Sequence, residues 1–252
     1  GGVKVRPTFR ADQRFKENAA KSELEKRLDY FVEKGCKIAD YGFDFIDEGD
    51  ENLVWLIENC YKRKMLLQLH FGTFRNVNAK MYERCGKDSG FDIMRGAIDT
   101  DKLAKILDRE NARFGGLPKI VVYPLNDYDL RALGALTGAF PQVKLGAAWW
   151  FNDTVNGIKR QLETAAEYSA LGTQYGKDLD RLLAGGWVDV YEAPGMLTDS
   201  RSFSSYVRFD FYRRILSSFI GEKVEKGEYD ENAAITLAKK IAYENIKNAL
   251  AV

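Results

Sequence analysis

Three consecutive residues, Asp199, Ser200 and Arg201, follow an apolar run in the stretch "GMLTDSRSF" at 195–203. A guanidinium presents a planar pair of donors that matches a carboxylate, so Arg201 in this setting indicates a site for an anionic small molecule. The alternative is that Asp199 caps the helix that follows and Arg201 pairs with it. Ser200 is a candidate substrate-binding hydroxyl in the first interpretation.

His70, in "LQLHFG", is the only histidine of the chain. Imidazole changes its protonation near neutral pH, so His70 could carry a proton or bind a metal, and the alternative is a hydrogen-bonded structural histidine. Arg75 and Asn76 follow in "TFRN" as candidate substrate-binding donors, or as parts of a solvated loop. In "WWFND" side-chain alternation places one of Trp149 and Trp150 in the core and the other where it can flank a sugar ring.

These groups must be positioned by strands, and six apolar runs alternate with segments of helical periodicity. Alternation of this kind predicts an α/β fold, a (β/α) TIM-type barrel with polar groups at the carboxyl ends of its strands. The strands are expected at 3–9, 36–45, 65–72, 119–125, 143–150 and 187–197. Helices are expected from a capping box at Ser22 to Gly35, and at 51–64, 101–110, 127–138, 153–170, 176–184, 203–220 and 231–250.

Polar residues stand at the carboxyl ends of several of these strands or in the loops that follow: Arg10, Asp12, Asp40, Asp44, Asn126 and Asp127. A long stretch from Phe71 to about Ala97 has no expected regular structure, and we predict a functional loop there, such as a lid. Because six parallel strands leave two open edges, we also expect a homo-oligomer or a partner that covers them.

Composition excludes several classes of function. Lys and Arg total 38 against 37 Asp and Glu, so no net field would draw the chain to nucleic acid or to an anionic membrane. Three cysteines without a CxxC pair indicate reduced thiols in a cytoplasmic protein, and no apolar run is long enough to span a membrane. The range 1–252 fits a single domain, and the Gly1-Gly2 start predicts natural sequence upstream.

Five motifs occur in an order and spacing that resemble one known family. They are "PTFRAD", "GCKIADYGFD", "LQLHFGTFRN" with "DSGFD", "GAAWWFNDTVNGIKRQLE" and "GMLTDSRSFSSYVRFDFYRRIL". The family is uronate isomerase, also called glucuronate isomerase, a branch of the amidohydrolase superfamily. The motifs match the third to eighth strands of its barrel, so the resemblance implies a barrel without the family's N-terminal portion, incomplete or remodelled.

The resemblance implies a cytoplasmic aldose-ketose isomerase, an intramolecular oxidoreductase that interconverts D-glucuronate with D-fructuronate and D-galacturonate with D-tagaturonate. It implies a divalent metal such as zinc, with Asp199 as metal ligand or base, Arg201 on substrate oxygens and His70 as a metal ligand or catalytic group. The family's His-x-His motif is absent and Tyr41 stands where the family has histidine, which leaves Asp40 as a third candidate ligand. The alternative function is a catalytically inactive scaffold that still binds a sugar acid.

Overall fold

The computed structural model describes residues 5–172, 195–200 and 202–250, and its centre is a parallel five-stranded sheet. The strand order is β1-β2-β3-β6-β7, so neighbouring strands follow one another along the chain apart from a separate ribbon, β4-β5. The strands are β1 (Thr8–Arg10), β2 (Ile38–Phe43), β3 (Leu66–Phe71), β6 (Ile120–Pro124) and β7 (Val143–Leu145). This is the consecutive parallel order of a (β/α) barrel.

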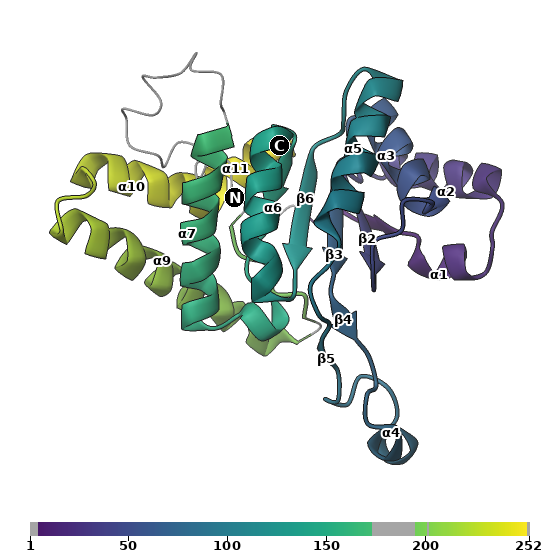
Figure 1. Ribbon diagram of the computed structural model, residues 1–252, viewed down its shortest axis with the longest axis horizontal. Helices are drawn as coiled ribbons and strands as arrows, with labels where there is room; N and C mark the ends of the chain where they lie inside the picture. Colours follow the sequence, from purple (N-terminus) through teal and green to yellow (C-terminus); the bar gives the residue numbers. More distant parts are fainter. Residues whose placement is uncertain (1–4, 173–194, 201, 251–252) are drawn as a thin grey trace.

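Helices that follow the strands along the chain cover one face of the sheet (Figure 1). They are α2 (Lys21–Glu33), α3 (Glu51–Arg63), α5 (Thr100–Phe114), α6 (Asp127–Ala139) and α7 (Val155–Gly172). The core between them and the sheet is aliphatic, with fully buried leucines and isoleucines such as Leu56, Leu67, Ile106 and Ile120. Burial of such a face is the main stabilisation of amphipathic helices.

Local sequence explains where most of these helices begin. The side chains of Asp50, Asp99 and Asn126 accept hydrogen bonds from backbone N–H groups of the first turns of α3, α5 and α6. The capping box expected at Ser22 is wrong, because α2 begins one residue earlier and its N-cap, Ala20, makes no side-chain bond. Lys21 is instead held by contacts with the Phe15 ring and with Asn52, so tertiary contacts determine this helix start.

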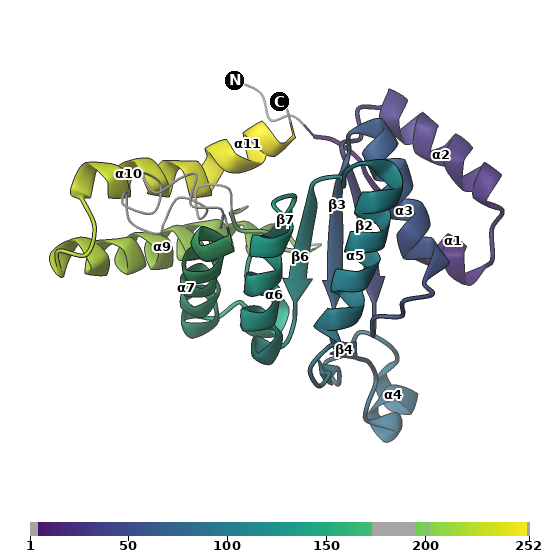
Figure 2. The same ribbon diagram turned by 45° about the horizontal axis from the view of Figure 1, so that its top comes forward.

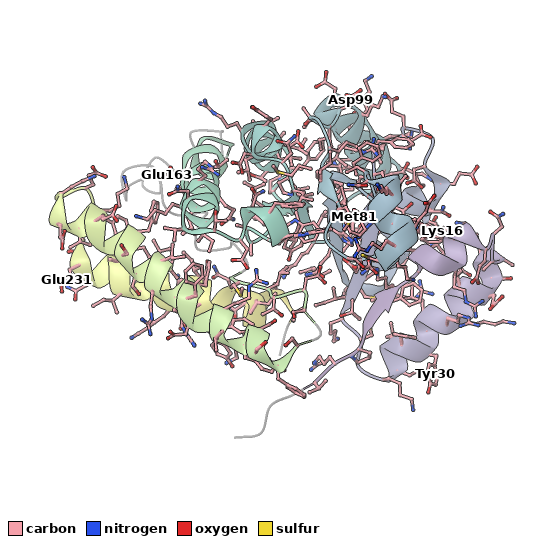
Figure 3. The ribbon with its side chains drawn as sticks, turned by 90° about the horizontal axis from the view of Figure 1, so that it is seen from below. Lys16, Tyr30, Met81, Asp99, Glu163 and Glu231 are labelled. Carbon is pink, nitrogen blue, oxygen red and sulfur yellow. The ribbon has the colours of Figure 1, made fainter. Side chains whose placement is uncertain are left out.

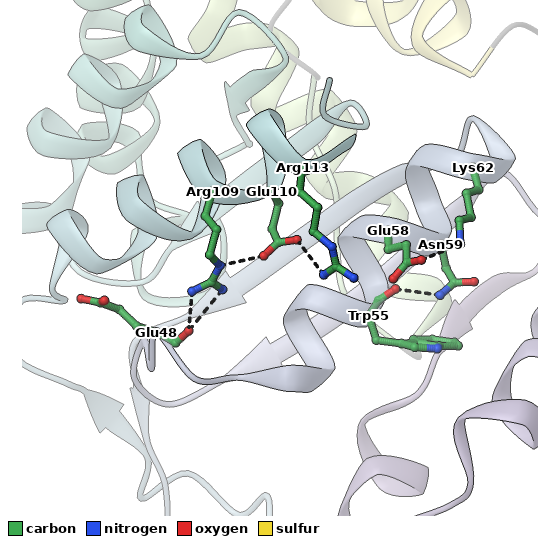
Figure 4. A network of polar contacts seen from close by, with 8 residues as sticks. All are labelled: Glu48, Trp55, Glu58, Asn59, Lys62, Arg109, Glu110 and Arg113. Carbon is green, nitrogen blue, oxygen red and sulfur yellow. Dashed lines mark hydrogen bonds and ion pairs between the residues drawn. The ribbon is translucent and has the colours of Figure 1, made fainter. Parts of the chain in front are cut away.

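A buried carboxylate fastens α5 to the segment that precedes α3 (Figure 4). Glu110 accepts hydrogen bonds from Arg109, at 2.8 Å, and from Arg113, at 3.4 Å, and its side chain is only 2% exposed. The Arg109 guanidinium also donates to the backbone carbonyl of Glu48. Because the buried charge has two charged partners, Arg109 can hold the segment before α3 to α5 without leaving Glu110 as an unpaired ion.

The opposite face of the sheet is covered in part by C-terminal helices. A short 3-10 turn, η3 (Phe203–Tyr206), leads into α9 (Val207–Glu225), which packs beside α7 and runs antiparallel to α10 (Glu231–Lys239) (Figure 1). A π-helical turn, η4 (Lys240–Glu244), and α11 (Asn245–Ala249) lead back to the amino ends of the strands (Figure 2). On this face of the sheet, Leu197 and Leu250 pack on a cluster of Leu66, Val121, Tyr123, Leu125 and Trp149.

The stretch after β3 is not structureless, which corrects the expectation for 71–97. It forms a small lobe made of β4 (Thr73–Phe74), α4 (Ala79–Cys85) and β5 (Ile93–Met94), with β4 and β5 paired antiparallel. The lobe projects beyond the carboxyl ends of the strands (Figure 1). Its base is fixed to α6, because the Asp129 carboxylate accepts from the Ile98 N–H and Asn126 donates to the Arg95 carbonyl.

Two expected elements fall mainly on residues that are not described. The helix at 176–184 lies outside the described residues, and so does most of the strand at 187–197, of which 195–197 has no regular structure. In the part that is described, the sheet has five strands and is not closed into a barrel. Two short elements were not expected, α1 (Asp12–Lys16) and a 3-10 turn, η1 (Trp150–Asn152).

Among the helices of the described ranges, none is both long and apolar enough to cross a membrane.

Candidate active site

An open cleft of about 1800 Å³ lies at the carboxyl ends of the strands, where (β/α) barrels place their active sites. Segments from β1, the lobe, the "WWFND" turn and the ranges 198–200 and 202–208 form its walls. Figure 3 views the molecule from this side, with Met81 of the lobe and Lys16 of α1 labelled. The lining residues are Arg10, Asp12, Lys16, Arg75, Asn76, Lys87, Asp88, Trp149, Trp150, Thr198, Asp199, Ser200, Ser202, Phe203, Ser204 and Arg208.

His70 lies next to this cleft, near the carboxyl end of β3. Its ring Nδ1 is 3.1 Å from Oδ1 of Asp40 on β2, and its Nε2 is 3.4 Å from Nη2 of Arg10. Gly42, directly opposite His70 in the β2-β3 register, leaves room for the ring, since a Cβ there would lie 2.4 Å from Nε2. Trp149 packs against the His70 ring in a T-shaped contact, with 5.6 Å between the two ring centroids.

The two polar neighbours of His70 indicate the same tautomer. A carboxylate only accepts hydrogen bonds and a guanidinium only donates them. Nδ1 therefore carries the proton and donates to Asp40, while the Nε2 lone pair faces Arg10. In this tautomer Nε2 accepts from the Arg10 guanidinium, which lines the cleft, so the basic nitrogen lies beside the cleft and not on its wall.

Arg10 connects His70 to the acidic groups of the site. Its Nε is 2.9 Å from Oδ2 of Asp12 and 3.5 Å from Oδ2 of Asp40. Partial burial lowers the pKa of Arg10, but the hydrogen bond that Arg10 donates to Asp12 and the charges of Asp12, Asp40 and Asp199 outweigh it, so the pKa is raised. The sequence placed Arg10 at a strand end without a role; the available signal was its position at the carboxyl end of β1, matching that of His70 near the carboxyl end of β3.

Tyr41 does not face the cleft. Strand alternation turns it to the helix side, where it is buried and its hydroxyl donates to Oδ2 of Asp50 at 3.0 Å. Burial, followed by the nearby Asp50 charge, raises the pKa of Tyr41 well above its ordinary value. The side chain that stands where the family has histidine is therefore part of the α3 cap and core.

One tryptophan is buried and the other is exposed, as expected, but strand alternation is not the cause, because β7 ends at Leu145 and Trp150 begins η1. Trp149 is 5% exposed, contacts His70 and donates from Nε1 to the Tyr123 carbonyl at 3.3 Å. Trp150 is 38% exposed and stacks on Phe151. The Arg75 guanidinium lies over the Trp150 ring, 5.3 Å from its centroid, so the lobe and the "WWFND" turn meet at the cleft.

Arg75 and Asn76 line the cleft and are held by one buried carboxylate. Asp92, with 6% of its side chain exposed, accepts from Nη1 of Arg75 at 3.1 Å and from the backbone N–H of Asn76 at 2.8 Å. Arg75 has a second, longer ion pair with exposed Asp88, at 3.5 Å. The Arg75 charge is thus partly balanced within the lobe.

Asp199 and Ser200 also line the cleft, whereas Arg201 lies outside the described residues. The alternative that Asp199 caps the next helix is wrong, because the Ser202 hydroxyl accepts from the Ser204 N–H as the cap of η3. Within the described ranges six non-glycine residues have positive φ, and four line the cleft: Asn76, Asp88, Trp150 and Asp199. Backbone strain of this kind concentrates at functional sites.

Other polar residues at strand ends serve the scaffold. Asn126 caps α6, and Asp127 forms an ion pair with Arg160 of α7. Asp153 pairs with Arg208, a cleft residue that also donates to the Thr198 carbonyl. Asp44 makes only a 4.0 Å contact with Arg95. Position at a strand end was therefore not enough to identify a site residue.

The described donors do not fit the divalent metal that the resemblance implied. No three His, Cys, Asp or Glu side chains among the described residues converge in a metal-binding arrangement. The Nε2 atom of His70, which would be the imidazole ligand, faces the Arg10 guanidinium at 3.4 Å. A divalent cation at that nitrogen would lie against a positive charge.

Comparison with known proteins identifies relatives along most of the chain. A family model described as glucuronate isomerase matches residues 50–181 and 188–250. The uronate isomerase of Serratia proteamaculans (strain 568) is 32% identical over 266 residues, which cover 91% of this chain and 52% of that protein. That of Staphylococcus haemolyticus (strain JCSC1435) is 34% identical, covering 89% and 52%. The chain spans about half the length of these curated relatives.

Solved structures show the same relationship in three dimensions. The uronate isomerase from Thermotoga maritima matches with a TM-score of 0.75 and 26% identity, over 91% of this chain and 53% of that one. The glucuronate isomerase from Caulobacter crescentus has the same TM-score at 23% identity, over 92% and 50%, a likeness in fold. The open sheet thus corresponds to part of the barrel of this family.

Proposed function

Because the chain belongs to the glucuronate isomerase family, we propose that it interconverts the aldose and ketose forms of a sugar acid. The substrates would be D-glucuronate and D-galacturonate, with D-fructuronate and D-tagaturonate as products. The observation that carries the proposal is the pairing of a base with an electrophile: the Nε2 lone pair of His70 lies 3.4 Å from the Arg10 guanidinium beside the cleft. Proton transfer next to a stabilised oxygen is what this isomerisation requires.

The reaction is a balanced transfer of hydrogen within one molecule. Nε2 of His70 accepts the proton from C2 of the aldose, and the released electron pair forms the C1=C2 bond of an enediolate with its charge on O1. The O2 hydroxyl proton then moves to O1, the C2=O bond forms, and the imidazolium returns its proton to C1. C2 is oxidised and C1 reduced, so no external oxidant is needed.

The remaining cleft residues suit a sugar acid. Trp150 is partly exposed at the cleft, and Arg75, Asn76 and Ser200 can hydrogen-bond to hydroxyls. Arg201 is assigned to the substrate oxygens through the family motif. Lys16 and Lys87 also line the cleft and, within the described ranges, neither has an ion-pair partner, so both are candidates for the substrate carboxylate.

The test is turnover together with isotope exchange at C2. The protein is incubated with D-glucuronate in deuterated water; fructuronate formation and deuterium in the returned glucuronate are measured by NMR. We expect both in the wild type, loss of both in His70→Gln, and a reduced rate in Arg201→Met. Asn232→Ala, on α10, is the matched control and should behave like the wild type.

Asp199 is the competing proton acceptor, and the same assay separates the two. If His70 is the base, Asp199→Asn retains exchange at C2 while His70→Gln does not. Absence of turnover in the wild type, or a wild-type rate in His70→Gln, would contradict the proposed mechanism.

A further inference from the structure

The Arg10 guanidinium is surrounded by the types of donor that a metal ion would use. Two carboxylates and one imidazole nitrogen face it: Asp12 at 2.9 Å, Asp40 at 3.5 Å and Nε2 of His70 at 3.4 Å. Catalytic zinc sites in proteins commonly use three ligands of these types. Here the centre of the donor set holds a protein cation.

We propose that the Arg10 guanidinium takes the place of a divalent metal at this site and supplies the positive charge that stabilises the enediolate oxygen. Arginine keeps its charge at all relevant pH values and presents several donors in one plane. Position 10 is fixed by the β1-β2 register, in which Arg10 lies opposite Asp40. The placement of Arg10 stands on geometry alone, and its role toward the enediolate rests on the proposed function.

Charge explains why the two cations exclude one another. A metal bound to Nε2 of His70 would be repelled by the guanidinium, which already contacts both carboxylates. Removing the guanidinium would leave Asp12, Asp40 and His70 without their counter-charge. Oδ1 of Asp12 is already buried without a hydrogen-bond partner among the described residues, so it could accept a cation. The three side chains do not converge on one point in the described structure. Loss of Arg10 should therefore create metal affinity by letting them move together around a cation.

The experiment titrates Zn²⁺ and Mn²⁺ into the wild type, Arg10→Ala and Arg10→Lys. Binding is measured by calorimetry, and Zn²⁺ contact with the imidazole by ¹⁵N NMR of the only histidine. In the wild type and in Arg10→Lys we expect no uptake at this site and an unmoved His70 signal. In Arg10→Ala we expect affinity at least about tenfold higher, or about 1.4 kcal/mol, and a shifted His70 signal. Thermal unfolding checks that each variant is folded.

Two outcomes would overturn the placement of Arg10. One is stoichiometric metal binding by the wild type that His70→Gln removes; the other is no gain of affinity in folded Arg10→Ala. The catalytic half is tested by chelation: turnover should survive EDTA, and Arg10→Lys should lower kcat more than it changes KM. Loss of turnover with EDTA would overturn that half. An inactive wild type would contradict the isomerase proposal itself, while the metal titrations would still decide the placement of Arg10.

Discussion

Gly42 leaves space for the imidazole of His70 on the neighbouring strand. Adding one methyl group at this position, in Gly42→Ala, should therefore lower both stability and activity. In Gly42→Ala the added Cβ would lie 2.4 Å from Nε2, so the ring must move away from Asp40 and Arg10. Overpacking of this kind costs about 1–3 kcal/mol of unfolding free energy. A misplaced catalytic group can lower the rate by about 10²-fold. Chemical denaturation and turnover measure the two effects.

The matched control is the same substitution in a helix. Gly221 lies in α9, and a Cβ there would meet no atom within 4 Å. Gly221→Ala should therefore stabilise the protein by up to about 1 kcal/mol through helix propensity and leave turnover unchanged. Equal stability changes of the same sign at both positions would contradict the close approach at Gly42.

Asp129 predicts a dependence of stability on pH. Burial raises its pKa above the ordinary 3.8, and the hydrogen bond from the Ile98 N–H offsets only part of this. The protonated form is favoured in the folded state, so this contribution to stability is present below pH 3.8 and is lost as pH rises through the raised pKa. Asp129→Asn keeps the acceptor for Ile98 and cannot ionise.

We therefore expect Asp129→Asn to be more stable than the wild type at neutral pH, with an advantage that shrinks as pH falls toward 3.8. Urea denaturation over a series of pH values measures it. Asn232→Ala, on α10, removes no ionisable group, so its difference from the wild type should be the same at every pH. An advantage independent of pH would show that ionisation of Asp129 is not the cause.

At the scale of elements, the lobe formed by β4, α4 and β5 depends on Asp92. Asp92→Ala removes the acceptor for both Arg75 and the Asn76 N–H, so we expect faster hydrogen exchange across 73–94. KM for the sugar acid should rise more than kcat falls, because the lobe carries binding groups rather than the base. Asp88→Ala is the control, since Asp88 is 67% exposed and its contact with Arg75 is longer. Equal effects of both variants would contradict the anchoring role.

Elements whose ends are determined locally could be predicted from the sequence. The ranges 51–64 and 127–138 agree with α3 and α6 to within about a residue, because Asp50 and Asn126 supply the caps from the adjacent positions. The start of α2 could not be predicted, since contacts of Lys21 with Phe15 and Asn52 decide it. The contact between Arg10 and His70 joins residues sixty positions apart, so no local pattern reveals it.

At the scale of the whole molecule, the sheet has β1 and β7 as its outer strands in the described part of the chain. Unpaired strand edges favour association with another chain. We propose that the protein self-associates, with a mass by light scattering that increases with concentration. Thr8→Lys places a charge on β1 and should reduce association, whereas Asn232→Lys on α10 should not. A monomeric mass at every concentration would contradict this.

The architecture as a whole was predictable only in its α/β class and strand order. The apolar runs specify which segments become strands, and five of them form the sheet in chain order. Closure of the sheet into a barrel depends on which strands pair with β1 and β7. Such pairing joins distant parts of the chain, so no single apolar run of the sequence predicts it. Leu197 and Leu250 cover the face of the sheet opposite α2, α3, α5, α6 and α7, and this contact between distant parts of the chain also has no local signal.

The T-shaped contact between His70 and Trp149 gives the cleft an optical reporter. An imidazolium quenches the emission of an adjacent indole more strongly than a neutral imidazole does, and these rings are 5.6 Å apart. Fluorescence from Trp149 should therefore dim whenever His70 holds a proton on both nitrogens. In a variant that keeps Trp149 as its only tryptophan, stopped-flow recordings could follow proton transfer from the sugar during turnover, in real time and without a label.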